Sequence, residues 1–448
     1  MTRRRVLGVL GAVGVAAAGA AGTVAVSRAA GQADGGTDAP RPGGGPEAPG
    51  SGGGSDGATA GGRGKDGPGK RGRSRQTGVR SVYLGSFGAG ITIGTYDERT
   101  GALTATGGYH GIGDPSFLAP GPTGRVLYAL DERSDGTVRA LAVGARGALT
   151  PLGPARSTGG DHPTHLAVHP TGRHLLTANY GSGSVAVHPI GPDGALGERT
   201  DLVRHTGSGP DPERQEGPHA HQVLPDPAGR FVLAVDLGTD TVYTYRLDPA
   251  RGRLAPVSRA RMTPGSGPRH LAFHPRGRFA YVVGELDGTV TVAGYDPRDG
   301  RLDPRRSLPT LPEDAGRGER NYPAGVVVSA DGRFVYVSNR GHDSVARFAV
   351  TNGGGGLRLL DTVPCGGSWP RGLGLAPSGG LLFTGNQNSG TVGVFRVDGR
   401  TGALTPAGEP FRAPSPVCVL PLALPAGPHA DGNPHGDGSG NGTADGAP

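Results

Sequence analysis

The sequence has very little cysteine, few aromatic residues and almost no helical periodicity. Cys365 and Cys418 are the only cysteines among 448 residues, so a metal cluster held by several thiolates is excluded. Apolar residues at the spacing of an amphipathic helix are nearly absent. Aromatic residues are not interleaved with basic ones, which gives no support for nucleic-acid stacking. Within residues 79–424 no serine lies in a G-x-S-x-G elbow, and no phosphate-cradling glycine loop occurs.

Glycine and proline are abundant, with 87 and 41 residues, and much of this excess lies at the two ends of the chain. Residues 31–78 and 425–448 have too few apolar side chains to offset the entropy lost when a backbone becomes ordered. We therefore expect a disordered linker over 31–78 and a disordered tail over 425–448. Residues 79–424 are then the folded domain, which is long enough for a sizeable core.

The N-terminus has the composition of an export signal. Residues 3–5 are arginines, and they precede an apolar run to Val26 and small residues to Ala30. Basic, then apolar, then small residues describe a signal peptide, and the paired arginines resemble the twin-arginine type. We expect residues 1–30 to be such a signal and the protein to be extracytoplasmic, secreted or in the cell envelope, without stable membrane insertion after cleavage. An uncleaved membrane anchor is the alternative.

The formal net charge of +7 is modest, and much of the local excess lies in residues 63–80. A basic segment could attract an anionic envelope surface or nucleic acid. A solvated linker accounts for the same residues, and we favour it. We therefore expect no nucleic-acid partner.

One unit of sequence recurs along the folded domain, and each copy contains a tight turn with glycine. The turn glycines lie roughly 50 residues apart, the spacing of a propeller blade, at Gly124, Gly172, Gly229, Gly277, Gly332 and Gly379. Each copy reads as an alternating strand A, the turn, strand B, a polar loop and strand C. A shorter strand D follows a Gly-x-Leu turn, as at residues 101–103 and 402–404.

The first copy lacks strand A. Residues 82–86 read as strand B and residues 91–96 as strand C, and the missing strand occurs at the far end, at residues 416–420. A blade built from both ends of the chain closes the ring without leaving an exposed sheet edge. The sequence therefore predicts an all-β, seven-bladed β-propeller of four-stranded antiparallel blades, in which the C-terminal strand completes the first blade.

The two cysteines could form a disulfide in an oxidising compartment. Cys365 falls near a blade edge, however, and Cys418 lies within a predicted inner strand. We therefore expect two structural thiols.

A circle of side chains is predicted at one mouth of the central channel. A proline precedes each strand A, and the residues that follow it are Ser116, Thr164, His219, Arg269, Ala324, Arg371 and Val417. Strand B returns to the same mouth, where it ends at Tyr180, Leu237, Glu285, Arg340 and Gln387, preceded by Asn179, Asp236, Gly284, Asn339 and Asn386. His221 is added because alternate residues of a strand share a face.

The side chains gathered by these two counts suit an anionic substrate. Glu285 or a histidine could activate water, and the arginines could bind a carboxylate or phosphate and stabilise an oxyanion. Nearby guanidiniums should lower the pKa of Glu285 and keep it ionised. Structural ion pairs between blades would be another explanation for Glu285 beside Arg269 or Arg340.

His219 and His221 could also ligate a metal, because imidazole is a common metal ligand. No third ligand is spaced to complete such a site, so we expect neither a metal nor another cofactor. His162, His165 and His270 lie near the same mouth and could instead cap blade edges.

Several stretches resemble the bacterial 6-phosphogluconolactonase family of seven-bladed propellers, which is related to fungal carboxymuconate lactonizing enzymes. These stretches are residues 179–181 (Asn-Tyr-Gly), 217–221 (Gly-Pro-His-Ala-His), 267–271 (Gly-Pro-Arg-His-Leu), Glu285, 338–344 and 369–372. Each one alone is a weak signal, but together they run through most of the blades and are specific.

The resemblance implies metal-free hydrolysis of a sugar lactone to its acid by His221 (or His219), Arg269, Glu285 and Arg340. We expect the lactone, anionic or sugar-like, to be bound in a monomeric enzyme by His219, Arg371, Asn179, Tyr180, Asn339 and Gln387. Phosphogluconolactone is one candidate only, because sugar phosphates are cytoplasmic and the chain carries an export signal. The alternatives are a muconate cycloisomerase-type enzyme and a non-catalytic extracytoplasmic binding scaffold.

Overall fold

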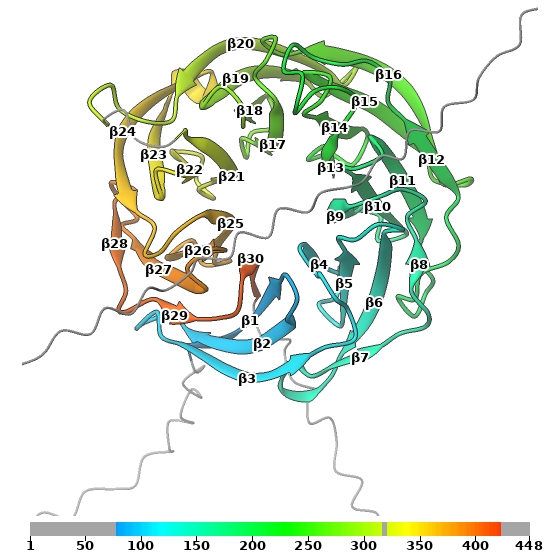
Figure 1. Ribbon diagram of the computed structural model, residues 1–448, viewed down its shortest axis with the longest axis horizontal. Coiled ribbons are helices and arrows are strands. Elements are labelled where there is room, and N and C mark those ends of the chain that lie inside the picture. Colours follow the sequence, from blue (N-terminus) through cyan, green and yellow to red (C-terminus); the bar gives the residue numbers. More distant parts are fainter. Residues whose placement is uncertain (1–77, 316–319, 423–448) are drawn as a thin grey trace, which may run out of the picture. The chain divides into compact units, whose positions relative to one another are not determined.

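The computed structural model describes residues 78–315 and 320–422, which form seven antiparallel sheets around a central channel (Figure 1). The predicted signal over 1–30, the linker over 31–78 apart from its last residue, and the tail over 425–448 lie outside the described residues. Within the described ranges the only helical elements are two short 3-10 turns, η1 (Ala145–Gly147) and η2 (Asn352–Gly354). These ranges contain no helix with the length and apolar character needed to cross a membrane.

Each blade runs from an innermost strand at the channel to an outermost strand at the rim. Blade 1 is β30 (Pro416–Leu422), β1 (Val79–Ser86), β2 (Gly90–Asp97) and β3 (Leu103–Tyr109). Blade 2 is β4 (Leu118–Pro120), β5 (Val126–Asp131), β6 (Thr137–Val143) and β7 (Leu149–Pro151), with β8 (Arg156–Ser157) also paired to β6. Blade 3 is β9 (Pro163–Val168), β10 (His174–Asn179), β11 (Ser184–Pro189) and β12 (Asp201–Arg204).

The other four blades repeat this order. Blade 4 is β13 (Ala220–Pro225), β14 (Val232–Asp236), β15 (Thr241–Asp248) and β16 (Arg253–Arg261), and blade 5 is β17 (Pro268–Phe273), β18 (Phe279–Gly284), β19 (Thr289–Asp296) and β20 (Arg301–Pro309). Blade 6 is β21 (Tyr322–Val328), β22 (Phe334–Arg340), β23 (Ser344–Thr351) and β24 (Gly356–Pro364). Blade 7 is β25 (Pro370–Leu375), β26 (Leu381–Asn386), β27 (Thr391–Val397) and β28 (Leu404–Pro406), with β29 (Phe411–Arg412) also paired to β27.

The predicted fold is confirmed, including the way the ring closes. The innermost strands β4, β9, β13, β17, β21, β25 and β30 surround the channel in Figure 1. β30 pairs antiparallel with β1, with Leu420 opposite Tyr83 and Val419 opposite Leu84. The C-terminal strand therefore completes the blade whose other three strands come from the N-terminal part of the domain.

The core lies in layers between neighbouring blades. In one layer Tyr281 and Val292 of blade 5 pack with Val337 and Phe348 of blade 6, and all are buried. Burial of a large apolar side chain contributes about 1.5–3 kcal/mol relative to its exposure. Each blade is thus stabilised by the next one, and a blade missing one strand would leave two such layers incomplete.

A repeated tyrosine in strand B ties each of several blades to its neighbour. The hydroxyl of Tyr336 donates to the carbonyl of Gly402 in the Gly-x-Leu turn of the next blade at 2.8 Å. The same contact joins Tyr83 to Gly147 and Tyr281 to Gly354. A turn that the sequence marks only by glycine therefore also provides a hydrogen-bond acceptor for the adjacent blade.

The two cysteines are both free and buried, in agreement with the expected structural thiols. The thiol of Cys365 donates to the carbonyl of Gly367. Burial raises the pKa of both thiols to about 12. Both sulfurs are therefore protonated and unreactive at neutral pH.

Candidate active site

β-Bulges at the start of several inner strands aim the predicted side chains into one mouth of the channel. In β13, Ala220 lies opposite Asp236 and Gln222 opposite Val235, so His221 is the extra residue. Equivalent irregularities occur at Arg269 in β17 and at Arg371 in β25. Arg269 and Arg371 directly follow the prolines that begin β17 and β25, and His221 lies three residues after Pro218. Proline has no N–H to donate to the ladder of backbone hydrogen bonds. A bulge of this kind redirects a side chain.

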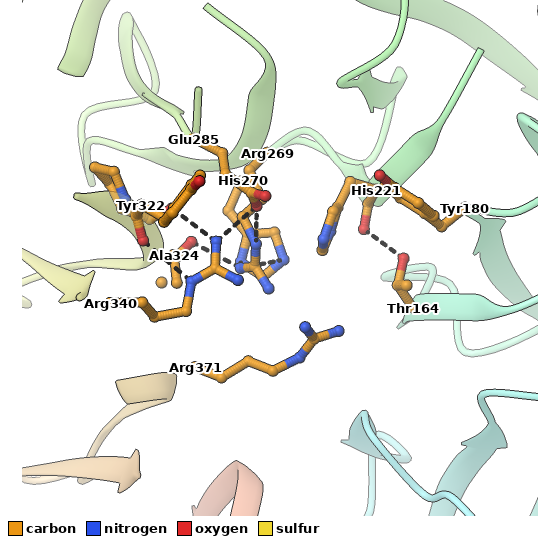
Figure 2. Close-up of polar contacts among 12 residues, drawn as sticks. Thr164, Tyr180, His221, Arg269, His270, Glu285, Tyr322, Ala324, Arg340 and Arg371 are labelled. Atoms are coloured by element: carbon orange, nitrogen blue, oxygen red, sulfur yellow. Dashed lines mark hydrogen bonds and ion pairs between the residues drawn. The ribbon is translucent and has the colours of Figure 1, made fainter. Parts of the chain in front are cut away.

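Glu285 is the centre of the charged groups at this mouth. Its carboxylate is buried and contacts three guanidiniums: Arg269 Nε at 3.0 Å, Arg340 Nη2 at 2.8 Å and Arg214 Nη2 at 2.7 Å. Figure 2 shows Arg269 and Arg340 converging on this carboxylate from neighbouring blades. The predicted grouping of Glu285, Arg269 and Arg340 is present in the structure.

Electrostatics keep the Glu285 carboxylate ionised. Burial by itself would raise its pKa, but the guanidiniums of Arg340, Arg269 and Arg214 outweigh that effect and hold the pKa well below its ordinary value. Two of these arginines also donate to backbone carbonyls, which fixes their positions. Arg269 donates to Ala324 at 2.8 Å and Arg340 donates to Tyr322 at 3.1 Å. Glu285 is therefore a weak base that is ion-paired with three cationic side chains.

His221, unlike Glu285, is uncharged. Its imidazole is buried, and burial together with the charges of Arg269 and Arg371 lowers its pKa well below 6.5. Thr164 donates its hydroxyl to the His221 carbonyl at 3.1 Å, and the ring meets that of Tyr180 edge-to-face. Figure 2 shows the imidazole directed into the space between Arg269 and Tyr180. His221 is thus an uncharged ring at neutral pH, next to fixed positive charge.

Two more imidazoles continue from His221 into the channel. The ring centre of His270 lies 5.2 Å from that of His221, and that of His165 lies 5.5 Å from His270. Burial lowers the pKa of His165 to about 3, and burial with the charge of Arg269 lowers that of His270 well below 6.5. They line a channel cavity of about 310 Å³ beneath the mouth, together with Phe117. Of the two alternatives left open for these histidines, a place near the mouth and the capping of blade edges, the structure shows His165 and His270 lining the channel wall.

The mouth is a cavity of about 430 Å³. Its lining includes His221, Glu285, Arg340, Arg371, Tyr180 and Gln387 from the predicted set, and also Thr164, Glu132, Arg214, Tyr322 and Trp369. Arg371 Nη2 donates to Glu132 Oε1 at 3.1 Å. In Figure 2 the Arg371 guanidinium reaches into the same opening as His221.

Three of the predicted substrate-binding side chains are engaged elsewhere. Asn179 and Asn339 are buried, and their amides donate to Ser184 and Ser344 within their own blades. His219 stacks on Tyr180, 4.4 Å between ring centres, and lies 3.2 Å from Glu216. None of the three lines the mouth cavity. Regular alternation from His219 to His221 does not hold, because His219 precedes β13 and His221 is the bulged residue.

Sequence counting missed Arg214, Glu132 and Trp369. Glu132 follows strand B of blade 2 as Glu285 follows strand B of blade 5, but the loop to strand C is one residue longer there, so the count did not reach it. Arg214 comes from the loop between β12 and β13 and is placed there by Gln215, whose buried amide donates to the Leu237 carbonyl at 2.8 Å. Glu132 follows β5, and Trp369 precedes β25. The available signal was the repeat itself, since Trp369 directly precedes the strand-initial Pro370.

Positive charge exceeds negative charge at this site. Three guanidiniums, from Arg214, Arg340 and Arg371, line the mouth cavity with two carboxylates, Glu132 and Glu285, and a fourth, from Arg269, lines the channel cavity and contacts Glu285. With uncharged imidazoles the balance favours an anion or a developing oxyanion over a cation. In the part of the chain that the structure describes, no group of three or more His, Cys, Asp or Glu side chains is arranged to hold a metal ion.

Comparisons with known proteins show the family to which the chain belongs. The family profile described as "Lactonase, 7-bladed beta-propeller" matches residues 81–421. The chain is 37% identical over 344 residues to the 6-phosphogluconolactonase of Bacillus subtilis (strain 168), which covers 75% of this chain and 97% of the relative. It is 35% identical over 312 residues to a 6-phosphogluconolactonase of Pectobacterium carotovorum, covering 69% and 88%. The structure of a periplasmic gluconolactonase of Pseudomonas aeruginosa superimposes with a TM-score of 0.73 at 31% identity, covering 78% of this chain and all of the other.

Proposed function

Because this chain belongs to the family of seven-bladed β-propeller lactonases, we propose that it hydrolyses a sugar-type lactone to its acid at the charged mouth, without a metal. The observation that carries the proposal is the uncharged, buried imidazole of His221 facing an excess of guanidinium groups in one cavity. Ester hydrolysis needs a base that takes a proton from water and a cation that stabilises the oxyanion. The mouth contains both.

The proposed reaction uses His221 as the base. Water attacks the lactone carbonyl carbon while the imidazole accepts its proton. The oxyanion that forms is stabilised by Arg340, Arg269 or Arg371. Collapse of the tetrahedral intermediate breaks the ring C–O bond, and the imidazolium returns the proton to the departing ring oxygen. The product is the open hydroxy acid, whose carboxylate is matched by the same guanidiniums.

In this scheme Glu285 is a positioning residue. Its ion pairs with Arg269 and Arg340 hold these guanidiniums in place, and because three guanidiniums occupy its carboxylate it does not serve as the base. Thr164 and Tyr180 fix the position of His221. Asn179, Asn339 and His219 are then supports of the blade and loop backbone rather than ligands.

The charge balance supports an anionic substrate or product. All four guanidiniums contact a carboxylate, but there are only two carboxylates, so the group carries a net excess of positive charge. A phosphorylated lactone would supply the opposing negative charge at once, whereas an unphosphorylated lactone would supply it only as the oxyanion and the product carboxylate develop. Both are candidate substrates.

Export is the second part of the proposal. It rests on the arginine-led, apolar N-terminal segment and on the similarity to a gluconolactonase described as periplasmic. We expect the variant with Arg3→Lys and Arg4→Lys to accumulate in the cytoplasm of the host, while wild-type protein is recovered outside it in a shortened form. Equal cytoplasmic retention of both would overturn the twin-arginine assignment.

The hydrolase proposal is tested with the purified full-length chain on glucono-δ-lactone and its 6-phosphate, with and without a chelator. We expect turnover that the chelator leaves unchanged and that falls at least 100-fold in Arg269→Met. Arg306→Met, an exposed arginine of β20, is the matched control and should retain wild-type turnover. Absence of turnover on any lactone would rule out the hydrolase and leave a binding scaffold or a cycloisomerase. Loss of turnover with chelator would rule out the metal-free reaction.

A further inference from the structure

One loop brings a cation to the mouth from outside the repeated strands. It covers residues 205–219, between β12 and β13, and its tip carries Arg214. Arg214 Nη2 lies 2.7 Å from Glu285 Oε1 and donates to the Tyr180 hydroxyl at 3.3 Å. The Arg214 side chain is 36% exposed, whereas the other two guanidinium partners of Glu285 are 3% and 6% exposed. The position of this most exposed cation therefore depends on how the loop is held.

The tip of the loop is ordered by its own hydrogen bonds. The side-chain carboxylate of Asp211 accepts the backbone N–H of Glu213 at 3.0 Å and that of Arg214 at 3.1 Å. The N–H of Gln215 donates to the Asp211 carbonyl at 2.8 Å. A tip with these internal contacts keeps its own shape, so the place of Arg214 over the mouth is set by the points at which the loop is attached to the blades.

Both ends of the loop attach to one carboxylate, that of Asp236. Asp236 ends β14 and is fully buried. His205, the first residue of the loop, places Nδ1 2.6 Å from Asp236 Oδ2. His219, the last residue, donates its backbone N–H to Asp236 Oδ1 at 3.0 Å. The Gln215 side chain donates to the carbonyl of the next residue, Leu237. All three attachments thus lie at the end of β14.

The surroundings of His205 indicate why a histidine occupies this position. Its side chain is 1% exposed and stacks on Tyr243, with 3.9 Å between ring centres. A carboxylate accepts hydrogen bonds, so Nδ1 donates to Asp236. The other ring nitrogen, Nε2, is buried and has no partner among the described residues. An unpaired buried nitrogen is destabilising, and phenylalanine would stack on Tyr243 without that cost. The Nδ1 donor is therefore the property for which histidine is suited here.

We propose that Asp236 and His205 form a loop clamp, a pair of positioning residues that hold Arg214 against Glu285 at the mouth. Neither clamp residue lines the mouth or the channel cavity, so the clamp acts through Arg214. Without it one end of the loop is released, and the mouth loses one of its cations. The effect on turnover rests on the proposed function, whereas the effect on the loop is independent of any reaction.

The first test measures the loop and needs no turnover. Arg214 is the only arginine or lysine in residues 205–219, so trypsin cleavage of the full-length protein after Arg214, followed by mass spectrometry, reports on the release of this loop. His205→Phe keeps an aromatic ring and removes the donor, and we expect it to raise the initial cleavage rate about tenfold or more. His205→Asn, whose amide can donate from the position of Nδ1, should stay near wild type. A wild-type rate in His205→Phe, or an equal rise in both variants, would overturn the clamp.

Tyr336→Phe is the control for a general loss of stability. It deletes a buried hydrogen bond between blades 6 and 7, whereas the loop joins blades 3 and 4. We expect its cleavage rate after Arg214 to equal that of wild type. A rise as large as that in His205→Phe would show that cleavage follows global unfolding, and would contradict the clamp.

The second test asks whether the clamp acts on the reaction through Arg214. With the lactone that wild type hydrolyses, we expect Arg214→Met and His205→Phe each to raise KM about threefold to tenfold, with a smaller change in kcat. Combining them should add little to the effect of Arg214→Met alone, because residues that act through one contact are non-additive. Additive increases in KM would overturn the positioning role. If wild type hydrolyses no lactone, the proposed function fails and the trypsin rates alone decide the clamp.

Discussion

At the residue scale, the site depends on two groups whose protonation is set by their surroundings. His221 is kept uncharged by burial and by neighbouring guanidiniums, and Glu285 is kept ionised by three of them. The buried carboxylate is therefore a structural anion, and the buried imidazole is the group that can accept a proton. The carboxylate is occupied by arginines, and the imidazole is available as a base.

The pH dependence follows from the direction of the His221 shift. A base acts in its deprotonated form, so lowering its pKa moves the acidic limb of kcat/KM to lower pH. We expect the rate to stay constant from about pH 8 down through about 6.5, the ordinary pKa of histidine, and to fall only in more acidic solution. Initial rates corrected for spontaneous hydrolysis would measure this, and a midpoint at or above that ordinary value would contradict it.

Removing the Glu285 charge should destabilise the protein as well as slow it. Glu285→Gln leaves the buried guanidiniums of Arg269 and Arg340 without a counter-charge, which costs about 3–5 kcal/mol of unfolding free energy. Glu132→Gln, which leaves a single partly exposed partner, Arg371, should cost much less. Urea denaturation measures both, and added phosphate should stabilise Glu285→Gln more than wild type. Equal stabilities of the two variants would contradict the central position of Glu285.

The residues of the site were only partly predictable. The positions after each strand-initial proline and at the end of strand B follow from the repeat, and they identified Arg269, Glu285 and Arg340. Arg214 comes from a loop that differs in length from its counterparts, so no repeat position marks it. Asn179 and Asn339 share the predicted positions, yet the NH2 groups of their short amides donate to a serine five residues further along the chain.

At the element scale, the bulges explain why side-chain alternation was an unreliable guide. A regular β13 would place His219 and His221 on one face. The actual strand begins at Ala220, and its bulge directs His221 alone into the cavity. Sequence alternation predicts the body of each strand well, but an extra residue at a strand end leaves no mark in the pattern of apolar and polar residues.

The tyrosine contacts between blades give a test at this scale. Tyr336→Phe deletes the hydroxyl that donates to Gly402 and leaves its buried carbonyl without that bond, so we expect a loss of about 1 kcal/mol. Tyr96 is equally buried, but its hydroxyl has no partner among the described residues. Tyr96→Phe should therefore be neutral or stabilising. Equal losses in urea denaturation would show that the inter-blade hydrogen bond does not contribute.

At the scale of the whole domain, the ring was fully predictable because one unit recurs and the first copy lacks a strand that appears at the far end. The closing pair β1–β30 and the layers between blades make the fold cooperative. The mouth gathers side chains from several blades, so its geometry depends on closure. The excess of arginines at the mouth was predicted from the repeat positions, whereas the channel cavity was not.

Truncation tests closure directly. A chain that ends at residue 415 lacks β30 and leaves β1 with an unpaired edge, so we expect it to lose its cooperative unfolding transition or to aggregate. A chain that ends at residue 424 keeps β30 and should have the Tm of the full-length protein. A native-like Tm for the shorter chain, measured by thermal circular dichroism, would contradict the role of the closing strand.

The central claim is that His221 is the base of a lactone hydrolase, and its most direct test is the turnover of His221→Gln. The variant keeps a polar side chain of similar length but cannot accept the proton at neutral pH. With glucono-δ-lactone or its 6-phosphate, whichever wild type turns over faster, we expect kcat of His221→Gln to fall about 100-fold to 10,000-fold while Tm stays near wild type. A kcat within about threefold of wild type in a folded His221→Gln protein would contradict it.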